Sequence, residues 1–186
     1  MNIIDTNISD VKILEPKVWN DARGYFFESF RDDEFLEKVC NTHFVQENES
    51  RSVAGVVRGL HFQRPPHTQA KLVRVVRGSV LDVAVDIRHG SPTFGQHVAV
   101  ELNEDNHRML FVPRGFAHGF AVLSDIAVFV YKCDNYYAPQ SEGGISLDDP
   151  SLAIDWRIPA AERILSEKDQ HHSLLSEADL DCFSLL

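Results

Sequence analysis

An arginine and a histidine stand close together in one strand-like stretch, Arg58-Gly59-Leu60-His61-Phe62-Gln63-Arg64-Pro65-Pro66. A histidine that rigid β structure holds beside a cation is a candidate proton-transfer group. Side chains three residues apart point to opposite faces of a regular strand, so Arg58 and His61 share a cavity only if a bulge re-aims one of them. Gly59 permits such a distortion. Lys71 follows in the next strand-like run, Gln69 to Val73.

Three further side chains are candidates for acid–base chemistry. Of the nine histidines, His118 shares with His61 an apolar, glycine-flanked β context, although a lone histidine there is more often a hydrogen-bonded structural residue. Tyr131 carries a phenol, which ordinarily keeps its proton at neutral pH and can donate it. The alternative for Tyr131 is a strand aromatic with its hydroxyl at the sheet edge. Asp169 could pair with a histidine, and the sequence leaves this open.

Polar side chains alternate along residues 44–52. Gln46, Asn48 and Ser50 recur at a period of two, which in a strand places them on one face. That face either lines a ligand site or is the solvated face of an edge strand, and the pattern favours neither.

The alternative to proton transfer is metal binding, with His61, His67 and His118 as three nitrogen ligands. The sequence has no His-x-His pair, and no carboxylate follows His61 until Asp82. Lys71 would also place a cation beside the metal. We therefore expect neither a metal nor another cofactor.

Many short strands with turns between them must position these residues. Val80 to Ile87 alternates apolar residues with Asp82, Ala84 and Asp86, which predicts one buried and one polar face. The spacing of strands and turns is typical of an all-β sandwich or barrel.

A short helix is expected after Asp32 or Asp33 as its cap, and another from Ser166. We predict a single domain over residues 1–186, with a β-barrel core at about 43–135 and a C-terminal segment, 139–186, packed on it. The runs predicted as strands are 11–17, 25–30, 44–52, 71–76, 80–87, 96–102, 109–112 and 127–133.

Composition excludes some classes of function. The 186 residues carry a net charge of −10, which disfavours general binding to nucleic acid but permits one anionic ligand where a few cations converge. The N-terminus lacks the features of a signal peptide, and no apolar run is long enough to span a membrane. Three cysteines without a CxxC motif indicate reduced thiols, so we expect a cytoplasmic protein.

Several motifs in one order resemble the dTDP-4-dehydrorhamnose 3,5-epimerase family. The similarity runs nearly from end to end. The resemblance implies a cupin-type jelly-roll barrel with short flanking helices and a small helical tail, a homodimer with exchanged strands, and no cofactor. The motifs are Asp21-Ala22-Arg23-Gly24, Gln46-Glu47-Asn48, Arg58-Gly59-Leu60-His61, Lys71, Val85-Asp86-Ile87-Arg88, 113–120, Tyr131-Lys132-Cys133, Asp148-Asp149-Pro150 and 165–169.

The resemblance also implies a dTDP-4-dehydro-6-deoxy-D-glucose substrate and roles for individual residues. His61 would be the base, oriented by Asp169, while Lys71 would stabilise an enolate and Tyr131 would be the acid. One departure is Trp19, where the family pattern has Phe before the turn at 21–24; an aromatic plane is kept. The residues expected to bind the nucleotide sugar are Trp19, Arg23, Phe27, Glu28, Gln46, Glu47, Asn48, Arg58, His118, Glu142 and Lys168.

Two rival functions remain. One keeps the fold but acts at a single sugar carbon, or as a 3,4-ketoisomerase. The other is a metal-dependent cupin oxygenase or a sugar-binding module without catalysis. Both carbons that flank a C4 ketone lose their protons to give an enolate, which needs a fixed cation or hydrogen-bond donor in a dry pocket. The set of His61, Lys71 and Tyr131 favours epimerisation.

Overall fold

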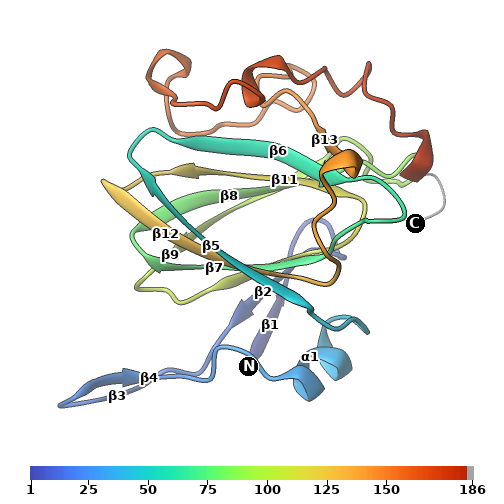
Figure 1. Cartoon of the computed structure of the whole chain (residues 1–186). Coiled ribbons are helices and arrows are strands. Elements are labelled where there is room, and N and C mark those ends of the chain that lie inside the picture. Colours follow the sequence, from blue (N-terminus) through green and yellow to red (C-terminus); the bar gives the residue numbers. More distant parts are fainter. Residues whose placement is uncertain (184–186) are drawn as a thin grey trace.

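The computed structural model describes residues 1–183, and antiparallel β-strands dominate it (Figure 1). Within these residues α1 (Asp32–Lys38) is the one α-helix, and no helix is long and apolar enough to cross a membrane. The strands are β1 (Asn2–Asp5), β2 (Lys12–Glu15), β3 (Trp19–Asp21), β4 (Gly24–Phe26), β5 (Gln46–Val53), β6 (Val57–Gln63), β7 (Lys71–Arg77), β8 (Ser79–Asp86), β9 (His97–Asn103), β10 (Met109–Val112), β11 (Phe116–Val122), β12 (Ile126–Cys133) and β13 (Glu142–Gly144).

Two sheets form the body of the molecule. A six-stranded sheet has the order β1-β2-β10-β7-β12-β5, and a five-stranded sheet has the order β13-β6-β11-β8-β9. Neighbouring strands within each sheet are antiparallel. This strand order confirms the expected all-β jelly roll.

Three apolar layers hold the sheets together. One fills the space between the two sheets and contains Phe120 and Phe129. A second, with Phe35 and Phe111, lies under α1 against the six-stranded sheet. The third packs the C-terminal segment onto the outer face of the five-stranded sheet, where the segment runs along β6 (Figure 1). Trp156 and Phe183 belong to this third layer and are almost completely buried. The five-stranded sheet is therefore covered on both faces.

The double covering overturns the expectation of a polar face on β8. Every residue from Val80 to Asp86 is buried. Leu81 packs into the layer beneath the C-terminal segment and Ala84 into the layer between the sheets. The two aspartates of the strand, Asp82 and Asp86, are buried as well, so each needs a polar partner inside the protein.

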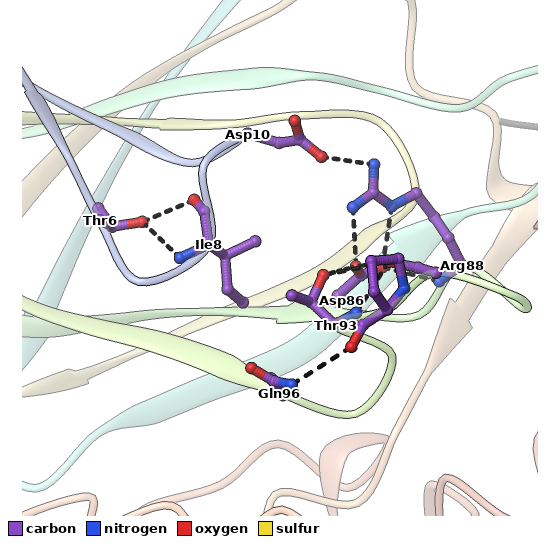
Figure 2. Close-up of polar contacts among 9 residues, drawn as sticks. Thr6, Ile8, Asp10, Asp86, Arg88, Thr93 and Gln96 are labelled. Atoms are coloured by element: carbon purple, nitrogen blue, oxygen red, sulfur yellow. Dashed lines mark hydrogen bonds and ion pairs between the residues drawn. The ribbon is translucent and has the colours of Figure 1, made fainter.

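Arg88 is the main partner of Asp86 (Figure 2). Its guanidinium donates to both carboxylate oxygens of Asp86, at 2.9 and 2.7 Å, and pairs with Asp10 at 2.8 Å. The hydroxyls of Ser91 and Thr93 also donate to Asp86, each at 2.6 Å. Burial raises the pKa of Asp86, but these hydrogen bonds outweigh it and hold the pKa below its ordinary 3.8. The network ties the loop after β8 to the N-terminal segment.

The N-terminal elements differ from the prediction in two ways. The expected aromatic strand, 25–30, pairs only over Gly24–Phe26, because β3 and β4 form a hairpin that projects away from the sandwich and has no third strand (Figure 1). The helix begins after Arg31 without a side-chain cap. Asp32 and Asp33 instead lie in its first turn, where negative charge favours the helix dipole.

The expected C-terminal helix is reduced to separate 3-10 turns, η2 (Ala160–Glu162), η3 (Asp169–His171) and η4 (Asp181–Phe183). The Ser166 hydroxyl does accept from the Asp169 backbone N–H, at 3.2 Å, as predicted. A longer helix does not form because residues on either side of η3 form isolated β-bridges next to β6 and β13. Ile164 pairs with Val56, and Ser173 pairs with Ile145.

A bulge in β6 places Arg58 and His61 on the same side of the strand. The register against β11 shifts between His118, opposite His61, and Phe120, opposite Arg58, so β6 has one extra residue. Gly59 supplies it, with φ of +143°. A side chain at this position would come within 2.7 Å of the Gly119 Cα. The bulge that the sequence required is therefore present, and it depends on a glycine.

Replacing Gly59 with alanine should destabilise the protein by more than about 1 kcal/mol, because the positive φ and the overlap with β11 both oppose a Cβ. Gly24→Ala is the matched control, since Gly24 has φ of +123° but no atom within 4 Å of the position that a Cβ would take. Urea unfolding of both variants measures the difference. Equal stability of the two would show that the approach of β11 does not constrain β6.

Candidate active site

A cavity of about 330 Å³ opens at one end of the two sheets. A smaller cavity of about 150 Å³ adjoins it, and both are lined by His61, Lys71 and Tyr131. The larger one is also lined by Gln46, Asn48, Phe62, Gln63, Gln69, Cys133, Tyr137 and Glu142. The smaller one is also lined by Ser50, Arg58, His118, Gly119, Phe120 and Phe129.

The two sheets supply different walls of these cavities. His61 comes from β6 and His118 from β11, both in the five-stranded sheet. Lys71 comes from β7 and Tyr131 from β12, both in the six-stranded sheet. The imidazole of His61 and the phenol of Tyr131 therefore face a shared space from opposite sides, with Lys71 beside the phenol.

His61 is held by Asp169, which η3 of the C-terminal segment carries. The distance from His61 Nε2 to Asp169 Oδ1 is 2.6 Å. Burial disfavours the charge on Asp169, but its hydrogen bond with His61 and its other polar contacts outweigh it and hold the pKa of Asp169 below its ordinary 3.8. An ionised carboxylate accepts only, so Nε2 carries the hydrogen and Nδ1 keeps a free lone pair. The pair is therefore arranged to take up a proton at Nδ1.

A second histidine–aspartate pair lies deeper, and the sequence did not predict it. His118 Nε2 is 3.0 Å from each carboxylate oxygen of Asp82, and both residues are buried. Asp82 appeared in the sequence only as one polar residue of an alternating strand. The signal that could have found it is the antiparallel register, in which Asp82 lies opposite Phe120, two residues from His118.

Burial shifts the pKa values of Lys71 and Tyr131, the two groups on the facing wall. It lowers the pKa of Lys71 below its ordinary 10.5, although nearby Asp82 and Glu142 act against it. It raises the pKa of Tyr131 above its ordinary 10, so the phenol keeps its proton. A cation or neutral amine and a neutral phenol thus stand opposite the His61 pair.

Several of the remaining predicted residues lie at the cavities. Gln46, Asn48 and Ser50 all point into them, so the period-two face of β5 is a cavity wall. Glu142 lines the larger cavity and forms an ion pair with Lys168. The sequence did not single out Gln63, Gln69, Cys133 or Tyr137, and the Tyr137 hydroxyl donates to Glu142 at 2.8 Å.

Five predicted residues do not reach these cavities within one chain. Glu47 alternates with Gln46 and Asn48, so it faces the other side of β5 and pairs with Lys132. The other four lie on or just after the β3–β4 hairpin, which projects away from the sandwich (Figure 1). These four are Trp19, Arg23, Phe27 and Glu28.

The three histidines considered as metal ligands have separate partners. His61 binds Asp169, His67 Nδ1 is 2.9 Å from the Ser141 hydroxyl, and His118 binds Asp82. A different group can offer three ligand atoms within residues 1–183. His61, Asp169 and His172 each place one such atom within 4.8 Å of the others.

The arrangement as a whole can remove a proton from a carbon acid on one face and return one on the other. A base with an orienting carboxylate stands on one wall, and a proton donor and an ammonium group stand on the other. Such a site stabilises the enolate that forms between the two steps.

Comparison with known proteins shows which family this chain resembles. Residues 5–177 match the family model described as dTDP-4-dehydrorhamnose 3,5-epimerase. The chain is 52% identical over 180 residues to the dTDP-4-dehydrorhamnose 3,5-epimerase of Shigella flexneri, covering 96% of this chain and 98% of that protein.

Solved structures agree in fold. A dTDP-6-deoxy-D-glucose-3,5-epimerase from Legionella pneumophila, in complex with dTDP-4-keto-L-rhamnose, is 52% identical with a TM-score of 0.94, covering 97% of this chain and 96% of that one. A 3′-monoepimerase from Streptomyces bikiniensis, in complex with dTDP-quinovose, is 34% identical with a TM-score of 0.85, covering 92% of this chain and 87% of that one.

Replacing Lys71 with methionine should stabilise the protein by about 1–4 kcal/mol, because an ammonium group that the fold partly desolvates gives way to an apolar side chain of similar length. Urea unfolding at neutral pH measures the change. Lys12→Met, which removes the surface ion pair with Asp5, is the control and should change stability by less than about 1 kcal/mol.

The difference in stability between the wild type and Lys71→Met should depend on pH. Because the pKa of Lys71 is lower in the folded state, the unfolded chain binds more protons between that pKa and the ordinary 10.5. Stability of the wild type should therefore rise with pH across that interval, relative to Lys71→Met. A stability difference that does not change with pH would contradict the lowered pKa.

Proposed function

The chain belongs to the dTDP-4-dehydrorhamnose 3,5-epimerase family, and from this we infer that it is an isomerase acting in dTDP-L-rhamnose biosynthesis. It inverts C3 and C5 of dTDP-4-dehydro-6-deoxy-D-glucose and forms dTDP-4-dehydro-L-rhamnose. One observation carries the mechanism that we propose for it: a histidine base and a tyrosine acid face the same cavity from two different sheets.

One base is sufficient for both carbons. In the D-gluco chair the hydrogens on C3 and C5 are both axial and lie on the same face of the ring. A sugar bound between the sheets with that face toward β6 presents both hydrogens to His61. Asp169 keeps the hydrogen of His61 on Nε2, so Nδ1 is the nitrogen that accepts the proton.

Lys71 is the group that we propose to stabilise the enolate. Removal of either proton moves negative charge onto the C4 oxygen, and a fixed cation near that oxygen lowers the barrier more than it would in water. Lys71 lines both cavities and is therefore close to the sugar wherever the ring sits between the walls.

Tyr131 returns the proton from the other face. Its raised pKa keeps the phenol neutral, which an acid requires. Protonation on the face opposite to abstraction inverts the carbon. After each inversion a proton has left through His61 and another has entered through Tyr131, so solvent hydrogen replaces the original one.

The nucleotide extends beyond these cavities. A volume of about 330 Å³ accommodates the sugar but leaves the pyrophosphate and thymidine at or outside its mouth. Arg58 stands beside the smaller cavity, and its Nε donates to the Ser52 hydroxyl at 3.2 Å. Arginine binds phosphate oxygens in pairs, so Arg58 is a suitable partner for the pyrophosphate.

We propose that the protein works as a homodimer in which the β3–β4 hairpin of one protomer reaches the cavity of its partner. The hairpin carries four of the residues expected to bind the nucleotide, yet it projects from its own sandwich (Figure 1). Its aromatic side chains are open to solvent, with 49% of Trp19 and 70% of Phe26 exposed. Apolar surface of this kind on an arm is typical of a protein–protein contact.

Two further properties follow as proposals. The reaction is a proton exchange through side chains, so it requires no cofactor. The three cysteines are unpaired, which suits a reducing compartment and supports a cytoplasmic location.

Deuterium entry tests the assignment of base and acid. In D₂O the wild type should convert the substrate and incorporate deuterium at C3 and C5, as followed by NMR. His61→Ala should lower incorporation at both carbons by at least about 100-fold, since an acid–base group contributes that much. Tyr131→Phe should retain some exchange but lose completed inversion, at C5 as well as at C3.

Two controls accompany these variants. His89→Ala and Tyr136→Phe alter exposed residues outside the cavities and should behave as the wild type. Undiminished exchange in His61→Ala would exclude it as the base. Exchange at C3 alone in the wild type would identify a single-position epimerase instead.

Heterodimers test the exchanged hairpin. Co-expressed His61→Ala and Arg23→Ala chains with different affinity tags give purified heterodimers. If the hairpin crosses to the partner, one of the two sites has both residues intact, and the heterodimer should have about half of the wild-type activity. If each hairpin serves its own chain, both sites are damaged and the heterodimer should be as inactive as the parent homodimers.

A further inference from the structure

A third imidazole, that of His172, lies against the His61–Asp169 pair, and the proposed reaction does not use it. Its side chain is 12% exposed, and among residues 1–183 its Nε2 is buried and makes no hydrogen bond, although Asp169 Oδ1 is 3.5 Å away. The His61 and His172 rings meet edge to face, with centroids 5.7 Å apart. A buried polar nitrogen without a partner is rare and calls for a ligand.

The space for this ring is built into the fold. His172 lies over Gly144 of β13, where an added Cβ would come within 2.3 Å of the imidazole. Gly144 is also the register partner of His61 in β6. The ring is therefore held between β13 and the base, and it is not a surface side chain that happens to fold inward.

The three side chains converge on one point. His172 Nε2 is 3.5 Å from Asp169 Oδ1, and His61 Nε2 is 2.6 Å from the same oxygen. All three ligand atoms lie within 4.8 Å of one another. Ligands bound to Zn²⁺ at about 2.0–2.2 Å in a tetrahedron are separated by distances of this order, so a small opening of the His61–Asp169 contact admits the ion.

We propose that His61, Asp169 and His172 form an inhibitory site for a divalent transition-metal ion of the Zn²⁺ type. Two imidazoles and a carboxylate are a donor set that such ions prefer. Of the three ligands, His61 alone lines the larger cavity, so the ion at its Nε2 sits on the side of the imidazole that faces Asp169 and His172.

The metal inhibits by moving a hydrogen within His61. The ion takes the Nε2 lone pair, so the hydrogen on that nitrogen moves to Nδ1 and the ring stays neutral. Nδ1 then has no lone pair with which to accept a proton from C3 or C5. This step rests on the proposed function, whereas metal binding itself does not. Substrate binding elsewhere in the cavity is unaffected, so kcat should fall while KM changes little.

Zinc titration of the full-length protein tests the site. Protein freed of metal with EDTA and dialysed is titrated with ZnCl₂ by calorimetry, and epimerisation is measured over the same Zn²⁺ range. The wild type should bind one more Zn²⁺ per chain than His172→Gln. The Zn²⁺ concentration for half inhibition should rise at least about 100-fold in His172→Gln, since even outer partners of a metal change affinity by 10–100-fold.

His171→Gln is the matched control, because the neighbouring His171 is exposed and is not among the three ligands. It should bind Zn²⁺ and respond to it as the wild type does. Inhibition is expressed relative to the rate of each variant in EDTA, so a change in basal activity does not affect the comparison.

Three results would overturn the proposal: equal Zn²⁺ binding in the wild type and His172→Gln, equal Zn²⁺ inhibition in these two proteins, or binding to the wild type without loss of kcat. A protein without epimerase activity in EDTA would contradict the proposed function instead, and calorimetry would still decide the metal site.

Discussion

The hydrogen bond between His61 and Asp169 joins two parts of the chain that are 108 residues apart, and the site depends on their packing. Asp169 is in place only because the C-terminal segment lies on the outer face of β6. Trp156 anchors that segment, with its Nε1 donating to the Leu147 carbonyl at 2.8 Å, and Phe183 packs edge to face on Phe62. Because Phe62 follows His61 in the same strand, the packing of Phe183 on Phe62 holds the part of β6 that carries His61.

Burial of polar groups at the site opposes folding, and the apolar layers offset it. Asp82 is fully buried and Lys71 is partly buried, and such groups are costly unless they are paired. The imidazole of His118 gives Asp82 a hydrogen-bond partner. In a chain with a net charge of −10, gathering Lys71 and Arg58 at one cavity creates a local attraction for an anionic substrate.

Residue types and strand alternation, which is local, indicated the candidate residues that the structure brings to one cavity. The period of two placed Gln46, Asn48 and Ser50 on one face of a strand, and the structure makes that face a cavity wall. The spacing of Arg58 and His61 allowed a shared cavity only with a bulge between them, and the structure has that bulge. Other features depend on distant segments and could not be predicted. The burial of Asp82 requires both faces of the five-stranded sheet to be covered, and the nearness of His172 to His61 requires the C-terminal segment to dock.

The distance between the two sheets determines the chemistry that the fold can support. Face-to-face sheets lie about 10 Å apart, a gap that large apolar side chains normally fill. At the site end, polar side chains such as Asn48 and Ser50 of β5 line this gap. A sugar ring can enter this gap and touch both walls at once. His61 and Tyr131, the base and acid that we propose, lie on the two walls, so the thickness of the sandwich determines whether they can reach opposite faces of the same carbon.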